Sequence, residues 1–168
     1  DEKFILVQKF IDLAHIRKTT RKISGIVKKT PLQESLSYSQ KYNSKIFFKR
    51  EDLQDVKSFK IRGAHTKILS IEKIKAKNGL VCASAGNHAQ GFAVSCSLLD
   101  YNGTVFMPST TPSLKVRLVK KFGGKNIKIK LVGENYSQAY KSAMNYCKRN
   151  RKTFIHPFDD IKVIEGQA

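Results

Sequence analysis

The stretch 57–64, Lys-Ser-Phe-Lys-Ile-Arg-Gly-Ala, places one lysine, Lys60, between two bulky apolar residues. An ammonium group in such surroundings loses hydration without gaining a counter-ion, which favours the neutral amine that attacks aldehydes. The flanking cations, Lys57 and Arg62, are either solvated or close enough to help keep that amine neutral. An ordinary lysine on a helix surface is the plain alternative. The pattern therefore indicates a candidate Schiff-base lysine.

The stretch 84–91, Ser-Ala-Gly-Asn-His-Ala-Gln-Gly, is a turn of small residues that leads into a predicted helix at Asn87. Backbone N–H groups at a helix start hold anions, and an amide side chain there can cap the helix and also bind a ligand. For His88, a packed or capping side chain that offers a ligand only its backbone N–H is the favoured interpretation. Together the two stretches indicate an enzyme built around an aldehyde cofactor.

Strand-like and helix-like segments alternate after Lys60. Short apolar strands are expected at 79–83, 103–107, 126–132 and 153–156. Helices are expected between them at 87–99, 112–122 and 136–149. Strands separated by helices of this length form βαβ units, so the sequence predicts an α/β fold with a mainly parallel sheet. Ligands gather at the carboxyl ends of the strands in such sheets, and the loop 84–87 follows one of these ends.

The part of the chain before Lys57 is predicted to hold other elements. An amphipathic helix is expected over about 4–23 with Gly25 as its stop, and a short helix over 34–42. The residue before Pro31 is restricted to extended backbone, and 45–50 is a β-prone run.

Composition narrows the class of protein. The 168 residues carry a formal net charge of +19, but the basic residues are spread along the whole chain. A solvated lysine-rich surface is therefore favoured over a nucleic-acid-binding face. No apolar run approaches the roughly 20 residues that span a bilayer, so a soluble protein is expected. The three cysteines form neither a zinc pattern nor a disulfide framework, which predicts no metal site and a reducing compartment, the cytoplasm.

Five blocks of the sequence, in their order and spacing, resemble one family. They are Thr30-Pro31-Leu32, Phe48 to Gln54, Lys57 to Ala64, Ser84 to Gly91 and His156 to Asp160. The chain from about Ile23 onward is thereby similar to threonine dehydratase, also called threonine ammonia-lyase. This enzyme belongs to the fold-type II pyridoxal 5′-phosphate (PLP) enzymes, whose fold resembles that of the tryptophan synthase β subunit. Serine dehydratases and serine racemases share most of the blocks, so the resemblance is less specific for the substrate than for the family.

The resemblance implies a role for each matched position. Lys60 would form the Schiff base with PLP and act as the base at the substrate α-carbon. Phe59 would pack against the cofactor, and Asn87 would hydrogen-bond the phenolic oxygen of its ring. The substrate carboxylate would be bound by the loop Ser84, Ala85, Gly86, Asn87 and His88. His156 is interpreted as structural rather than catalytic.

The reaction that the resemblance implies is elimination of water from L-threonine, which yields 2-oxobutanoate and ammonia as the first step of isoleucine biosynthesis. L-serine is a further candidate substrate, with dehydration or racemisation as the alternative activity. The partner is thus a small amino acid, and a homo-oligomer is expected of the full-length protein.

The resemblance also predicts a truncated fold. In the family a glycine-rich loop for the PLP phosphate follows a Gly-Gln-Gly-Thr segment, whereas here Gly166-Gln167 is followed by Ala168. Gly123-Gly124 is interpreted as a helix stop, not a substitute. We expect 1–56 to belong to a large PLP domain, 57–157 to form a small α/β domain and 158–168 to start the return to the large domain. A catalytically incomplete fragment, or half of a split enzyme, is the alternative to an active chain.

Overall fold

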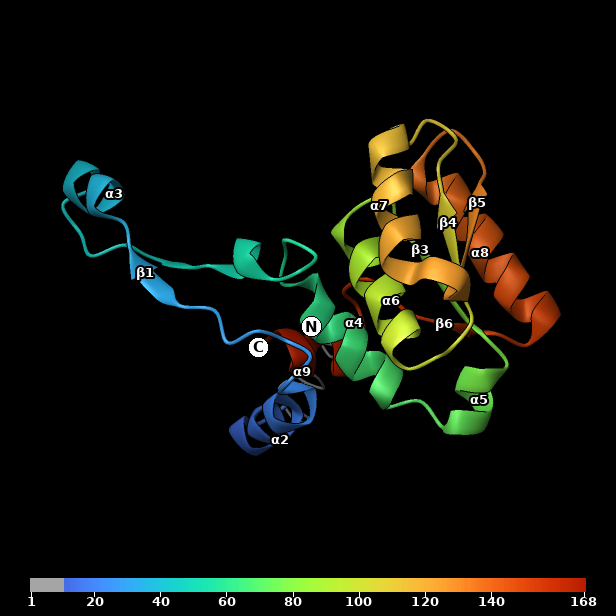
Figure 1. Cartoon of the computed structure of the whole chain (residues 1–168), viewed down its shortest axis with the longest axis horizontal. Helices are drawn as coiled ribbons and strands as arrows, with labels where there is room; N and C mark the ends of the chain where they lie inside the picture. The colour runs from blue at the N-terminus through green and yellow to red at the C-terminus, as the bar shows by residue number, and fades with distance from the viewer. Residues whose placement is uncertain (1–10) are drawn as a thin grey trace, which may run out of the picture.

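A four-stranded parallel sheet with helices on both faces forms the body of the protein, and an arm projects from it (Figure 1). The computed structural model describes residues 11–168. The strand order is β5-β4-β3-β6, with β3 (Leu80–Ala83), β4 (Gly103–Met107), β5 (Ile127–Leu131) and β6 (Thr153–Phe154). Each neighbouring pair is parallel, which confirms the predicted α/β fold and its four strands.

The helices that connect these strands cover opposite faces of the sheet, as Figure 1 shows. They are α6 (Asn87–Leu98), α7 (Ser113–Gly123) and α8 (Tyr136–Asn150), all three at the predicted places. Leu80 and Cys82 of β3 pack on the side of α6, whereas Val81 and Ala83 pack on the side of α8. This alternation is the two-residue period of a strand that is buried on both faces.

Three helices were not assigned from the sequence. They are α4 (Lys60–Leu69), α5 (Lys73–Lys77) and α9 (Ile161–Gln167), in addition to two single 3-10 turns, η1 (Glu51–Leu53) and η2 (Gly124–Asn126). Six of the eight residues from Ile61 to Ile68 of α4 are buried, among them the polar His65 and Thr66, so the polar residues of this stretch do not mark an exposed face. The sequence did contain a signal for the start of α9, namely Asp160, a residue type that caps helices. Its carboxylate accepts from the backbone N–H groups of Lys162 and Val163.

The first described helix is α2 (Leu13–Ile23), which begins where the Asp12 side chain accepts from His15 N at 2.8 Å. The predicted helix began at about residue 4, and its first part, up to residue 10, lies outside the described residues. Its predicted end is confirmed, since α2 stops two residues before Gly25, whose φ of +89° suits glycine.

The arm is an antiparallel ribbon of β1 (Leu32–Glu34) and β2 (Phe47–Lys49) with the short helix α3 (Leu36–Lys41) at its tip (Figure 1). The short helix and the β-prone run expected here are confirmed. All six strand residues are exposed, and the arm carries six exposed large apolar side chains: Leu32, Leu36, Tyr38, Tyr42, Phe47 and Phe48. A two-stranded ribbon is only marginally stable by itself. Within residues 11–168 these six side chains remain exposed, and together they form an apolar surface of the kind that marks an interaction site.

None of the helices within residues 11–168 is both long enough and apolar enough to cross a membrane. In the same part of the chain, no group of three or more His, Cys, Asp or Glu side chains is arranged to hold a metal ion.

The contact between α4 and α9 gives a direct test of the fold. A Cβ on Gly63 would lie 2.7 Å from the Val163 backbone carbonyl oxygen, which cannot yield without moving the helix. We expect Gly63→Ala to lower the free energy of unfolding by about 1–3 kcal/mol, measured by urea denaturation. Gly86→Ala is the control, because no heavy atom lies within 4 Å of its added Cβ, and its effect should stay within about 0.5 kcal/mol. Equal effects of the two variants would show that the helices do not approach as described.

Candidate active site

The loop between β3 and α6 lies at the carboxyl end of the sheet, as predicted. Ser84 N donates to Phe106 O at 3.0 Å, and Ser84 Oγ accepts from Gly86 N at 3.1 Å, so the loop is held at its start. The first N–H groups of a helix have no acceptor within it. Asn87, the first residue of α6, is exposed, and the space around the Gly86 Cα is open. The loop can therefore offer N–H groups and one amide to an anionic ligand.

The first turn of α4 is packed directly against the backbone of α6. A Cβ on Gly91 would lie 3.0 Å from Ile61 N and Cα and 3.1 Å from Lys60 C, so only glycine permits this approach without displacement. The Ser58 hydroxyl accepts from Lys60 N at 3.2 Å at the start of α4. The sequence-predicted Lys60 and the loop ending in Asn87, 24 residues apart at their nearest, are thus brought to the starts of two touching helices.

The amine of Lys60 is partly buried and rests on a backbone carbonyl. Its Nζ donates to Pro157 O at 2.9 Å and lies 5.1 Å from the centre of the Phe59 ring. Burial lowers the pKa of the Lys60 amine below its ordinary value, as the sequence led us to expect. Within the described part of the chain, no carboxylate lies at ion-pairing distance from this Nζ. Sequence reasoning missed Pro157, because a backbone carbonyl leaves no side-chain signature.

Of the two cations that flank Lys60 in sequence, Lys57 is exposed and Arg62 is paired with a carboxylate. Arg62 forms a two-bond ion pair with Glu51, from Nε to Oε2 at 2.8 Å and from Nη2 to Oε1 at 2.7 Å, and both side chains are mostly buried. Burial opposes ionisation of Glu51, but Arg62, Thr30 and Gln54 all donate to it and hold its pKa below the ordinary 4.5. Arg62 is therefore a structural residue, neither solvated nor a partner of Lys60.

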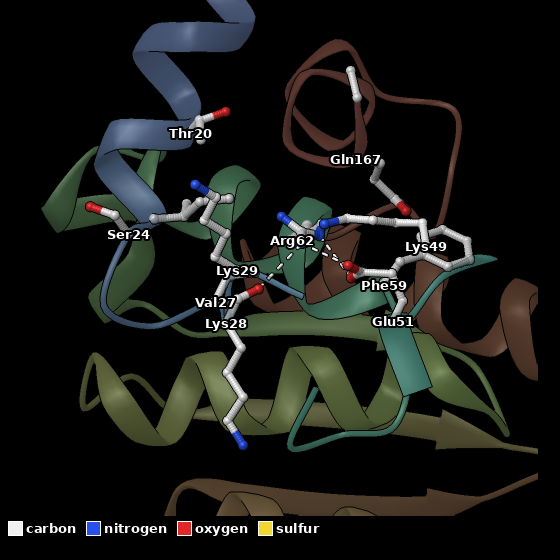
Figure 2. Close-up of a pocket in the computed structure, with 12 residues that line it drawn as sticks. Thr20, Ser24, Val27, Lys28, Lys29, Lys49, Glu51, Phe59, Arg62 and Gln167 are labelled. Carbon is white, nitrogen blue, oxygen red and sulfur yellow. Dashed lines mark hydrogen bonds and ion pairs between the residues drawn. The ribbon is translucent and has the colours of Figure 1, made fainter. Parts of the chain in front are cut away.

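A cavity of about 480 Å³ lies beside this ion pair, between α2, the base of the arm and the end of α9. Figure 2 shows Arg62 and Glu51 facing one another there, with Phe59 and Lys49 close by. Phe59 is the one sequence-predicted site residue that lines the cavity, and its ring is 44% exposed. The ring is thus available to a ligand.

The rings of His88 and His156 each bond to the backbone of this chain. The His88 ring is buried, with Nε2 at 3.1 Å from Ile155 O, so only its backbone can face a ligand. His156 Nδ1 accepts from the backbone N–H groups of Phe158 and Asp159 and so stabilises a turn.

These residues fit the aldehyde end of PLP. They offer an amine with a lowered pKa, an exposed aromatic ring within about 5 Å of it, and an open loop at a helix start. They do not include a cradle for the phosphate: Gly124, with a φ of +51°, ends α7, which agrees with its interpretation as a helix stop.

A parallel α/β sheet with such a lysine at its carboxyl end is the architecture of the fold-type II PLP enzymes. The family model described as "Pyridoxal-phosphate dependent enzyme" matches residues 23–168, and the chain belongs to this family.

Curated relatives narrow the likeness further. The chain is 48% identical over 158 residues to L-threonine dehydratase biosynthetic IlvA of Bacillus subtilis, which covers 94% of this chain and 37% of that protein. It is 45% identical over 166 residues to the protein of the same name from Staphylococcus saprophyticus. That alignment covers 99% of this chain and 38% of that protein. The chain therefore spans a little over a third of the length of these relatives.

Solved structures share the fold over nearly the whole chain. The processed form of threonine deaminase isoform 2 from Solanum lycopersicum has a TM-score of 0.80 and 32% identity, with 93% of this chain and 44% of that chain covered. Maize serine racemase has a TM-score of 0.84 and 29% identity. The superposition covers 92% of this chain and 46% of that chain.

The Arg62–Glu51 pair predicts how stability depends on pH. Glu51→Gln should lower the free energy of unfolding at pH 7 by about 2 kcal/mol, because a mostly buried guanidinium loses its counter-charge. The pKa of Glu51 is lower in the folded than in the unfolded chain, so its contribution is complete above 4.5 and is lost as the pH falls through the folded-state value. In denaturation experiments from pH 7 to pH 3, the free energies of unfolding of the wild type and of Glu51→Gln should therefore become more similar as the pH falls.

Asp52→Asn is the control for this prediction. It breaks the exposed pair with Arg50 and should change stability far less. A gap between wild type and Glu51→Gln that stays constant with pH would contradict the role given to the ion pair.

Proposed function

We propose that this chain carries the reactive lysine of a PLP-dependent threonine ammonia-lyase, which converts L-threonine into 2-oxobutanoate and ammonia. The observation that carries the proposal is the Lys60 amine, partly buried, resting on a carbonyl and without a carboxylate partner in residues 11–168. The identity of 45–48% to L-threonine dehydratases supports this choice of reaction.

Lys60 would hold the cofactor and then accept the substrate α-proton. PLP, when bound, supplies an electron-withdrawing ring that stabilises the negative charge left at the α-carbon. A lowered pKa keeps more of the amine neutral, and a neutral amine is both the nucleophile and the base that the reaction requires. The Pro157 carbonyl accepts a hydrogen of Nζ and so fixes the amine without occupying its lone pair.

The loop from Ser84 to His88 would bind the substrate carboxylate through its backbone N–H groups. The open space at Gly86 supports this role, as does the position of the loop at the start of α6. The exposed amide of Asn87 would donate to the phenolic oxygen of the cofactor, and Phe59 would pack against it.

L-serine is the alternative substrate, and the likeness to maize serine racemase supports keeping it. Loss of ammonia from threonine gives 2-oxobutanoate, loss from serine gives pyruvate, and racemisation gives D-serine. Assays of both amino acids with separation of these three products distinguish the alternatives.

The setting of the reaction belongs to the same proposal. The word "biosynthetic" in the relatives' names supports a place at the first step of isoleucine biosynthesis. The three cysteines, Cys82, Cys96 and Cys147, are free and buried, which fits a reducing compartment such as the cytoplasm. We propose a homo-oligomer for the full-length protein.

We further propose that residues 1–56 and 158–168 belong to a large PLP domain and 57–157 to a small one. The support is the contrast in burial: strands β3 and β4 are fully buried, whereas every strand residue of the arm is exposed. In this proposal the arm packs against the part of the family polypeptide that lies outside the matched residues.

The lysine assignment is tested by trapping. Incubation with PLP and then borohydride should leave a pyridoxyl group on Lys60, located by peptide mass spectrometry. Lys60→Ala should remove this adduct and lower PLP-dependent ammonia release by at least about 10³-fold in a catalytically complete protein. Lys73→Ala, at an exposed position of α5, should change neither.

One outcome would refute the assignment of Lys60, and another would exclude the alternative of an incomplete fragment. An adduct on other lysines but never on Lys60 would refute the assignment. Turnover by the 168-residue chain alone at ordinary rates would exclude the alternative that it is a catalytically incomplete fragment.

The role of the arm is tested by association. The 168-residue chain is mixed with the part of the B. subtilis relative that lies outside its alignment with this chain. The two should form a complex, which size-exclusion chromatography with light scattering measures. Leu36→Lys and Phe48→Lys should weaken the complex at least about tenfold, because each places a charge in a buried apolar contact. Ile74→Lys, at an exposed position on the body, should not. Equal binding by all three variants would refute the docking role of the arm.

A further inference from the structure

We propose that the side chain of His88 is a positioning residue for Lys60: it holds the end of β6, and through it the Pro157 carbonyl on which the lysine amine rests. The inference takes the role of Lys60 from the proposed function. Its geometry and its test, however, concern only residues of this chain and need no cofactor.

The His88 ring is placed to donate, not to titrate. It is the second residue of α6, 3% exposed, and its Nε2 lies 3.1 Å from Ile155 O. Burial lowers the pKa of the ring to about 4, and the nearby Lys60 and His156 act in the same direction. The ring is therefore neutral at pH 7, and since a carbonyl only accepts, the ring hydrogen must be on Nε2. Nδ1 is then a bare acceptor, and it has no partner among the residues described.

The strand that His88 holds is short and lies at the edge of the described sheet. β6 contains two residues and, among the described strands, pairs with β3 alone; the Phe154 ring packs edge-on against Tyr140, and the Ile155 side chain is fully buried in the core. Ile155 N donates to Val81 O at 2.8 Å, just after the strand ends. The bond from His88 to the Ile155 carbonyl is thus an additional attachment at the point where the chain leaves the sheet.

This attachment lies two residues from the acceptor of Lys60. Pro157 is buried and its carbonyl accepts from Lys60 Nζ at 2.9 Å. The turn that follows is braced by His156, whose Nδ1 accepts from Asp159 N at 2.7 Å. A shift of the Ile155 carbonyl would therefore be transmitted to Pro157. His88 also follows directly on Asn87. Its ring therefore connects the loop 84–87 with the segment whose Pro157 carbonyl accepts from Lys60.

The wild-type protein provides the first test. Long-range ¹H–¹⁵N correlation spectra of the 168-residue chain should show His88 as the neutral Nε2–H tautomer from pH 8 down to pH 5.5. An Nδ1–H tautomer, or protonation of His88 with a midpoint near 6.5, would overturn the proposal. This measurement does not depend on any variant folding.

The second test measures Lys60 itself. Competitive labelling of the amines with acetic anhydride, followed by peptide mass spectrometry, gives the pH midpoint of Lys60 with the other lysines as internal standards. In His88→Leu the midpoint should rise towards the ordinary 10.5, because a displaced Pro157 carbonyl would leave the amine more open to water. Amide exchange at Ile155 should become about fivefold faster, the factor expected for one lost hydrogen bond.

Two further variants separate positioning from general stability. His88→Gln keeps an N–H donor of similar reach and should restore both readouts. His65→Leu removes another buried imidazole, 2% exposed and also with a pKa lowered to about 4, but its Nδ1 has no hydrogen-bond partner among the described residues, and the variant should leave both readouts unchanged. Wild-type values in His88→Leu, or the same shifts in His65→Leu, would refute the role of His88.

Discussion

The contact between the first turn of α4 and the backbone of α6 is the constraint on which the rest of the site depends. Gly91 allows the two backbones to touch where any Cβ would meet Ile61 at 3.0 Å. The contact brings together the starts of two helices, one with Lys60 and one with the Ser84–Asn87 loop. The sheet fixes where this happens, because β3 ends directly before the loop and β6 ends just before the carbonyl that Lys60 contacts.

The charges around the lysine are arranged so that its amine stays unpaired. Glu51, which pairs with the α4 residue Arg62, is occupied by two bonds from that guanidinium and by donors from Thr30 and Gln54. In a chain with 32 Lys and Arg against 13 Asp and Glu, most cations must lack a partner, and solvation suffices for those on the surface. Lys60 differs because it is partly buried as well as unpaired, and this combination lowers its pKa.

The body and the arm differ in how they are stabilised. The sheet has apolar clusters on both faces, with side chains such as Leu80 and Phe92 fully buried, whereas the strands of the arm are exposed on both faces. Hydrophobic burial can therefore account for the order of the body but not for that of the arm. The cavity at the base of the arm is lined by Lys49 of β2 and by Phe59, next to the reactive lysine in sequence.

The sequence by itself determined the order of strands and helices from residue 79 to 156, because short apolar runs and helical periods there follow local rules. It also predicted roles for Lys60 and Asn87, whose motifs specify residue types. Helix α4 escaped it, since polar residues such as His65 and Thr66 are buried there together with the apolar ones, so polarity does not mark its exposed face. Helix α9 escaped it too. Only the tertiary structure decided that Arg62 pairs with Glu51, that His88 turns inward to Ile155 and that the Pro157 carbonyl receives the lysine. These contacts join residues 11 to 97 positions apart, and the last two end on backbone carbonyls, which every residue has and no sequence motif distinguishes.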